Sequence, residues 1–343
     1  TYLAEDVRRE LASIGIESLQ QIMGDTSLLS IDDKHQPLIN ELGLDLSFFT
    51  SAPKYRKTES LRSLSDAVSP FNTKIIHQLE EKINKNEPID EEYKIFNTDR
   101  SALATLFGLI ADKESKSRLA SIKEADATVQ PYNNEINLIF RGSAGQSFGV
   151  FQTEGVNIRL IGEANDSVCK SMSGGKTVIV PPDNAKYKPE ENAIIGNCAL
   201  YGATSGKFYV YGQAGDRFAV RNSGATAVVE GTGLHACEYM TNGTVVILGD
   251  TSDNVGAGMT GGELFLYEDP KTRVNTEYIV KAEMSNADSE KLRKIIEDYF
   301  KETNSSKAGY ILSDWEKVSN NFNKFIPHSM VDKNIVSKAE PAN

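Results

Sequence analysis

The sequence contains few of the residues that most often form reactive or metal-binding sites. Its 343 residues include three cysteines and four histidines, and both types are scattered along the chain. The cysteines Cys169, Cys198 and Cys237 are odd in number and form no C-x-x-C pair, which argues against a disulfide framework and favours a reducing compartment. No tetrahedral set of Cys and His ligands is evident, so we expect no metal site.

Long apolar runs and basic runs are missing as well. No apolar run approaches the roughly 18 residues of a membrane span, and the opening TYLAEDVRRE is too polar for a secretory signal. The net charge of −11 disfavours binding to phosphate backbones and to anionic membrane surfaces. We therefore expect no nucleic-acid or membrane partner and a cytoplasmic location, and the start at Thr1 instead of Met indicates a fragment or a processed chain.

The N-terminal part of the chain shows helical patterns. In residues 1–24 apolar residues recur at helical spacing and stop at a glycine: Leu3, Val7, Leu11, Ile14 and Gly15. Residues 25–88 are Pro-interrupted and predict a connector with one clear helix, NTKIIHQLEEKINK. The run IFNTDRSALATLFGLIADK at 95–113 predicts a strand, an Asn-Thr-Asp cap and a helix.

The region from about 136 to 268 changes character, because helical stripes disappear and short β-type runs recur between glycines. The glycines that end these runs are Gly142, Gly162, Gly212, Gly231 and Gly249. Their spacing indicates a repeat of about 19 residues. The longer gap between Gly162 and Gly212 fits two repeats plus an insertion, PPDNAKYKPEEN at 181–192.

Within each repeat the residues before the glycine alternate in character. The second and fourth residues back are all apolar: Phe140, Leu160, Val210, Val229 and Ile247, and Leu138, Ile158, Phe208, Ala227 and Val245. The third residues back are mixed, and we expect them to face water or a partner: Ile139, Arg159, Tyr209, Val228 and Val246. Alternation inside strands that repeat at a fixed longer period predicts a stacked β-solenoid.

The stretch GLHACEYMTNG at 233–243 brings three reactive residue types together: His235, Cys237 and Glu238. Counting from the strand-ending glycines places Cys237 in a column with Phe148, Val168, Phe218 and Val255, where Cys acts as a small hydrophobe. The same count places His235 in a polar column with Gln146, Asp166, Asp216 and Asp253. Side chains that point in opposite directions disfavour a nucleophile with its base, so we predict packing at Cys237 and no catalysis.

Two further patterns permit more than one interpretation. GSAGQSFG at 142–149 resembles a phosphate loop in composition, but it lacks a Lys-Ser/Thr ending and opens no helix, which favours a glycine corner. The column of Asp166, Asp216 and Asp253 is consistent with a cation-binding ladder, with a solvated acidic edge, or, with Arg217 and Arg221 nearby, with a domain-contact surface. We expect the region near Asp216 and Arg217 to be the docking face.

The same residues carry a family resemblance. The run 142–268 is similar to the C-terminal β-helix, or GXGXG, domain of the large subunit of glutamate synthase. The segments concerned are GSAGQSFG, ENAIIGNCALYGATSGK, AGDRFAVRNSGATAVVEGTG, HACEYMTNGTVVILG and NVGAGMTGGELFLY. YLAEDVRRELASIG resembles the segment that leaves the family's flavin-binding barrel, IFNTDRSALATLFGLIA the entry to the β-helix, and residues 303–327 the C-terminal helices.

The resemblance implies a fold that is mainly β: a right-handed parallel β-helix, a single-stranded solenoid of about seven coils, with helical extensions at both ends. Residues 1–95 would form a helical connector that resembles the end of the synthase domain, 96–275 the GXGXG β-helix domain and 276–343 a helical tail.

The resemblance also implies a role in making glutamate from glutamine and 2-oxoglutarate. In that family an amidotransferase releases ammonia, which a barrel with FMN and a 3Fe–4S cluster consumes. Since neither part is in this sequence, we expect no catalytic, cofactor-binding or metal-binding residue here, and a scaffold between amidotransferase and FMN-binding synthase domains. The alternatives are a free-standing β-helix subunit of a multi-subunit oxidoreductase and a carbohydrate-active β-solenoid enzyme. A plastid location would follow in a photosynthetic eukaryote.

Overall fold

The computed structural model describes residues 2–52, 69–123, 132–267 and 274–331. It divides the chain into two compact units, Thr1–Ala67 and Val68–Asn343. Residues 53–68 of the predicted connector and 332–343 of the predicted tail lie outside the described residues. Because the second unit begins at Val68, the boundary predicted after residue 95 falls inside this unit.

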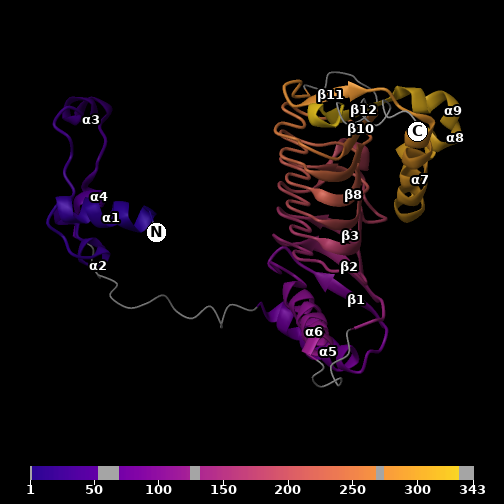
Figure 1. The fold of residues 1–343 in the computed structure, drawn as a ribbon, viewed down its shortest axis with the longest axis horizontal. Helices are drawn as coiled ribbons and strands as arrows, with labels where there is room; N and C mark the ends of the chain where they lie inside the picture. The colour runs from indigo at the N-terminus through magenta and orange to yellow at the C-terminus, as the bar shows by residue number, and fades with distance from the viewer. Residues whose placement is uncertain (1, 53–68, 124–131, 268–273, 332–343) are drawn as a thin grey trace, which may run out of the picture. The chain divides into compact units, whose positions relative to one another are not determined.

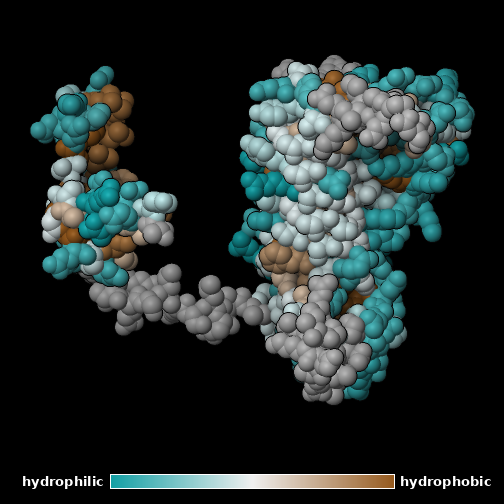
Figure 2. Space-filling model, in the orientation of Figure 1, coloured by the Kyte–Doolittle hydropathy of each residue, from teal (hydrophilic) through white to brown (hydrophobic). Residues whose placement is uncertain are grey.

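The first unit consists of short helices without a buried core. They are α1 (Tyr2–Ser13), α2 (Leu19–Ile22), η1 (Thr26–Leu28), α3 (Gln36–Leu42) and α4 (Ser47–Thr50). Gly15 has a φ of 74° just after α1, so the predicted stop is confirmed. None of residues 2–52 is buried, and Phe48 is 86% exposed. Brown apolar side chains accordingly lie on the surface of this unit in Figure 2.

The second unit is built on a 12-stranded, mostly parallel sheet flanked by helices (Figure 1). Its strands are β1 (Ile89–Ile95), β2 (Ile136–Ala144), β3 (Val156–Ala164), β4 (Ser173–Val180), β5 (Ala193–Ile195), β6 (Ser205–Val210), β7 (Gln213–Ala214), β8 (Ser223–Val229), β9 (Asn242–Ile247), β10 (Glu263–Tyr267), β11 (Ile279–Ala282) and β12 (Phe322–Pro327). Its helices are α5 (Pro70–Asn84), α6 (Ala104–Lys123), η3 (Pro189–Glu191), α7 (Asn286–Thr303), α8 (Ser306–Ser313), α9 (Trp315–Val318) and η4 (Ser319–Asn321).

The strand register confirms the predicted columns. The sheet order is β1-β2-β3-β4-β6-β8-β9-β10-β12-β11, and neighbours from β1 to β10 pair in parallel. Leu138 pairs with Ile158, and Phe140 pairs with Leu160. The ten apolar residues predicted from the repeat are all buried. β4 lies between β3 and β6, so the long gap does contain an additional strand.

Two apolar clusters hold this unit together. The larger one is formed by the predicted apolar columns and extends to α5 and α6 near β1. The smaller one joins the other side of the strands to α7, α8 and α9. It includes Tyr209, Val228 and Val246 from the third-residue column, which are buried. The partner that this column faces is thus the chain's own C-terminal helices.

Both predicted helical extensions contain strands as well. β1 pairs with β2, because its buried Ile89, Tyr93 and Ile95 alternate with outward charged residues. At the other end β12 pairs antiparallel with β10 and with β11, which gives the last parallel strand a hydrogen-bonded neighbour. The acidic composition of β1 and the helical pattern before β12 hid these strands from a reading based on periodicity alone.

Candidate functional site

The turns after the strands form one surface, and we take this turn face as the candidate site. It consists of residues 146–151, 166–171, 197–202, 216–221, 234–239 and 253–258. Backbone hydrogen bonds join successive segments, as from Ser147 N to Asp166 O at 2.8 Å and from Arg217 N to Leu234 O at 2.7 Å. The second, fourth and sixth residues of every segment have positive φ. Because this uncommon geometry recurs in each turn, it belongs to the fold and not to one reactive position.

The structure corrects the column assignment around His235 and Cys237 by one residue. Tyr209 pairs with Val228, whereas Ala214 pairs with Thr232. The chain therefore has one residue fewer between Val228 and Thr232 than between Tyr209 and Ala214. Ala236 therefore stands beside Phe218, and Leu234 takes the position predicted for His235. Counting from glycines missed this shift because it occurs after the strand ends. Cys237 instead joins the buried column of Cys169, Leu200 and Ala219, all with positive φ.

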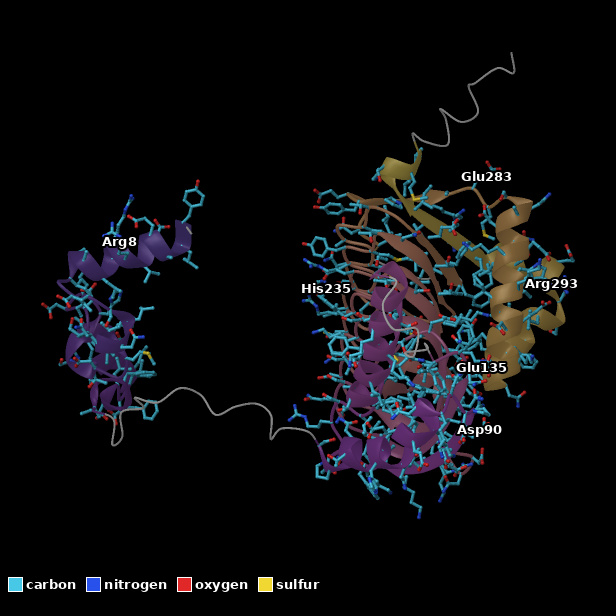
Figure 3. All side chains as sticks on the ribbon, turned by 60° about the horizontal axis from the view of Figure 1, so that its bottom comes forward. Arg8, Asp90, Glu135, His235, Glu283 and Arg293 are labelled. Carbon is cyan, nitrogen blue, oxygen red and sulfur yellow. The ribbon has the colours of Figure 1, made fainter. Side chains whose placement is uncertain are left out.

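His235 belongs to a polar cluster that spans three turns. Its Nδ1 lies 2.8 Å from Glu238 Oε1 and 3.0 Å from Asn254 Nδ2. Arg217 approaches the other oxygen of Glu238 at 3.5 Å, and Asn275 donates to Asn254 at 2.7 Å. Glu238 is buried, while His235 and Arg217 are half-exposed. Figure 3 shows His235 on the turn side, away from the α7 residue Arg293.

The buried thiols are not arranged for nucleophilic catalysis. Burial raises the pKa of both Cys169 and Cys237 to about 12, so neither forms a thiolate near neutral pH. Cys169 Sγ contacts Thr177 Oγ1 at 3.4 Å, whereas His235 is held by Glu238 and Asn254. Among the residues that the structure describes, no group of three His, Cys, Asp or Glu side chains could hold a metal ion.

In the acidic column, the carboxylates of Asp166 and Asp216 accept hydrogen bonds from backbone amides. Asp166 Oδ1 accepts from Asn197 N at 2.8 Å, and Asp216 Oδ1 accepts from Leu234 N at 2.8 Å. Asn197 Oδ1 in turn accepts from Asp216 N at 2.8 Å. Each side chain thus satisfies an amide of a neighbouring turn, and these oxygens do not converge on one point. Asp166 and Asp216 thus take part in a side-chain ladder between turns.

GSAGQSFG forms a glycine corner, as predicted. β2 ends at Ala144, and turns follow it instead of a helix. A Cβ on Gly145 would lie 2.7 Å from the carbonyl oxygens of Asn97 and Asp99. Glycine is needed there because two backbone segments approach closely, so no bound phosphate is required to explain it.

Two surface hollows lie elsewhere on the sheet. One of about 550 Å³ lies beneath the insertion and is lined by Arg141, Gly142, Ser143, Ile161, Gly162, Glu163, Pro182, Asp183, Asn184 and Tyr187. Arg141 in this hollow is paired with Glu92 at 2.7 Å, and Ser143 with Glu163 at 3.1 Å. The second hollow includes Lys176 and Lys207, which bind Glu302 and Asp298 of α7. These basic groups of both hollows therefore already have partners within the chain.

Sequence reasoning missed a buried polar cluster under α7 and α8. Glu230 is fully buried and accepts a hydrogen bond from Ser305 and one from Tyr299 at 3.0 Å. The alternation that buries Val228 against the helices continues two residues later to Glu230. Glu230 follows Val228 by two residues in the column that we expected to face water or a partner, so the sequence alone did not mark it as buried.

Comparison with known proteins identifies the family. The family model described as GXGXG motif matches residues 72–328. The chain belongs to the GXGXG motif family. The matched range includes most of α5, β1 and β12, so the GXGXG region coincides with nearly all of the described second unit.

Relatives of this GXGXG chain include ferredoxin-dependent glutamate synthases. The chloroplastic protein of Spinacia oleracea is 41% identical over 342 residues, and the match covers 96% of this chain but 20% of the relative. The protein of Pyropia yezoensis is 40% identical over 333 residues, with 96% and 21% covered. Ferredoxin-dependent glutamate synthase 2 of Synechocystis is 38% identical over 340 residues, again with 96% and 21% covered. The chain thus spans about one fifth of these relatives, in their C-terminal region.

The comparison also bears on location. The Spinacia relative is named as a chloroplastic protein. In the described part of this chain, no helix has both the length and the apolar character needed to cross a membrane.

Proposed function

We propose that this chain is the C-terminal structural region of a glutamate synthase, which makes two glutamates from glutamine and 2-oxoglutarate. The observation that supports this proposal most is the match of 96% of the chain to one fifth of several ferredoxin-dependent glutamate synthases. Their names also favour ferredoxin as the electron donor. The protein would act in plastids or, in a prokaryote, in the cytoplasm.

In this proposal the second unit is a right-handed parallel β-helix of about seven coils. The parallel pairing of β1 to β10, the joined turns and the common columns of positive φ all support stacked coils. Such a stack resists bending, because every coil is hydrogen-bonded and packed to the next. The chain would use this rigidity to fix the amidotransferase domain relative to the FMN-binding synthase domain.

The chemistry would lie outside this chain. FMN and a 3Fe–4S cluster would belong to the proposed synthase domain. Among the residues that the structure describes here, no three His, Cys, Asp or Glu side chains are grouped so that they could hold a metal ion. The GXGXG region would contribute placement: ammonia that passes between two active sites is lost if the domains shift, and small displacements cost large factors in rate.

Deleting the second unit from the intact enzyme tests the proposal. We expect glutamine hydrolysis to continue while glutamate formation per glutamine consumed falls severalfold, with ammonia released to the solution. The ratio of ammonia to glutamate, measured with glutamine and then with added ammonium as nitrogen source, is the decisive readout. A truncated enzyme in which both activities remain coupled would exclude a scaffold role.

A free-standing β-helix subunit is the second candidate. It differs in one measurable property, the size of the native polypeptide, since a separate subunit has the 37.6 kDa of this chain. An immunoblot of source extract with an antibody against residues 136–267 separates the two, and we expect a band several times larger.

A further inference from the structure

Glu230 lies in a buried group of oxygen atoms beneath the C-terminal helices. The short oxygen–oxygen contacts in this group outnumber the hydroxyl protons available to bridge them. Tyr299 Oη, on α7, lies 3.0 Å from the carbonyl oxygen of Val210 and 3.0 Å from Glu230 Oε1. Ser305 Oγ, the N-cap of α8, also contacts Glu230 Oε1 and accepts from Ala308 N at 3.0 Å. A two-centre hydrogen bond at each of these three contacts needs one proton between its two oxygens.

The two hydroxyl groups supply only two of the three protons. Each hydroxyl carries a single hydrogen, and burial together with the neighbouring Glu230 holds the pKa of Tyr299 well above its usual value, so it does not ionise. If Tyr299 donates to Val210 O, its contact with Glu230 requires a proton from the carboxyl group. If it donates to Glu230, two lone pairs face each other at Val210 O.

The burial of the Glu230 carboxyl group also favours its protonated form. Glu230 is fully buried, and its Oε2 has no hydrogen-bond partner. An ionised oxygen without a donor in such a place is costly, whereas a protonated carboxyl reduces that cost. The charged groups that face it are Lys307 on α8, which favours ionisation, and Glu190 on η3, which opposes it. Burial is the largest influence and raises the pKa of Glu230 to about 6.

We propose that Glu230 binds a proton in the folded protein and acts as a pH-sensitive latch that holds α7 and α8 on the strands. The protonated carboxyl completes the contacts with Tyr299 and Ser305, and ionisation removes one of them. Since the pKa is raised on folding, the stabilisation is complete below the ordinary pKa of 4.5 and is lost as the pH rises through about 6. The latch is independent of the proposed scaffold role.

What the latch covers is apolar. Val228, Val246 and Phe265 are fully buried in the cluster that they share with α7 and α8. Opening of the helices above pH 6 exposes this row of side chains, so proton release at Glu230 is linked to exposure of an apolar strip.

Hydrogen exchange of α7 and α8 in the intact protein, corrected for intrinsic rates, tests the latch. A pKa that rises from 4.5 to about 6 predicts that the opening constant increases roughly eightfold between pH 5 and 7.5. In Glu230→Gln, which is neutral at every pH, we expect this increase to vanish. The control Glu297→Gln changes an exposed residue of α7 paired with Arg293, and should keep the increase.

The outcome that overturns the latch is an opening constant that is equally flat, or equally pH-dependent, in the wild type and in Glu230→Gln. If Glu230→Gln does not fold, Ser305→Ala decides. Removing this donor disfavours the ionised form further, so we expect the rise in opening to move to higher pH. A Ser305 that serves only as a helix cap would lower protection without moving the pH range, and that result contradicts the proposal.

Discussion

At the residue scale, the recurring features of this chain serve the stacking of turns. Cys237 is an apolar packing residue, Asp166 and Asp216 bind backbone amides, and the glycines stand where backbones meet. His235 is restrained by Glu238 and Asn254 across neighbouring turns. Side-chain types that suggest reactivity in a sequence are thus explained by positions in a repeated turn.

Thiol reactivity tests the burial of the cysteines. Because the pKa values of Cys169 and Cys237 are raised to about 12, we expect both thiols to resist iodoacetamide at pH 8 until the protein unfolds. Cys198 is partly exposed and serves as the internal control. Site-resolved mass spectrometry measures the three rates, and labelling of Cys237 as fast as Cys198 in the native protein would contradict the assignment.

Glycine substitutions test the close approach of neighbouring strands. In Gly162→Ala the new Cβ would overlap the carbonyl oxygen of Gly142, and φ is 153°, so we expect a loss of at least about 2 kcal/mol in unfolding free energy. Gly108→Ala, in α6 with no atom within 4 Å of the new Cβ, should be neutral or stabilising by up to about 1 kcal/mol. Denaturant unfolding compares them, and equal effects would be inconsistent with the stacking.

At the element scale, charges set the direction in which α7 crosses the strands. Near its C-terminal end Asp298 binds Lys207 at 2.6 Å, and near its N-terminal end Lys291 binds Glu263. An acidic residue near a helix C-terminus is unfavourable for the helix alone, so the strand lysines offset that cost. Reversing the helix would place like charges together along its length.

The most buried ion pairs around α7 are those of Lys324 with Glu263 and Asp288. Lys324 Nζ lies 2.8 Å from Glu263 and 2.6 Å from Asp288, and its side chain is 11% exposed. We expect Lys324→Met to reduce the unfolding free energy by about 1–3 kcal/mol, since the partly buried Asp288 loses its cation and Glu263 keeps only Lys291. Lys294→Met, at an exposed pair with Glu290, should change it by less than about 0.5 kcal/mol.

The pH dependence of the same contact has a defined sign. Burial opposes ionisation, but hydrogen bonds and charges from Lys291 and Lys324 lower the net pKa of Glu263, and Lys324 with Ser285 does the same for Asp288. Lowered values mean that this stabilisation is present above the ordinary pKa values of 4.5 and 3.8 and is lost on acidification. In Lys324→Met we expect a smaller loss of stability on going from pH 6 to pH 3. Parallel pH profiles for both proteins would argue against the contact.

At the scale of the whole molecule, the two units differ in how they are stabilised. The second has two apolar clusters and continuous strand pairing, while residues 2–52 of the first have no buried residue. A segment without buried apolar surface cannot offset the entropy of ordering its backbone. The first unit is therefore expected to depend on contacts outside itself.

Separate expression of the two units tests this difference. We expect residues 68–343 to unfold in one cooperative transition and residues 1–67 to show little helix and no cooperative transition by circular dichroism. The 1–67 fragment in trifluoroethanol is the control for its intrinsic helix propensity. Cooperative unfolding of the short fragment in buffer would show that it has a core of its own.

The sequence by itself determined the repeated strands between about residues 136 and 268, their spacing and the inward columns, because alternation and the 19-residue repeat depend only on which residues avoid water. It also indicated that Cys237 is buried. It could not determine the one-residue shift at the corner after β8, since a turn's backbone geometry leaves no apolar signal. His235 and Cys237 were therefore given the wrong neighbours.

Only the tertiary structure decided what lies against the outer side of the strands. Val228 and Glu230 pack against α7 and α8, which come much later in the chain; Glu230 and its partner Tyr299 are 69 residues apart. No local pattern encodes a contact of that length, because either partner alone is compatible with water. Packing brought a carboxyl group and two hydroxyls together away from solvent, and that exclusion of water gives Glu230 its altered affinity for a proton.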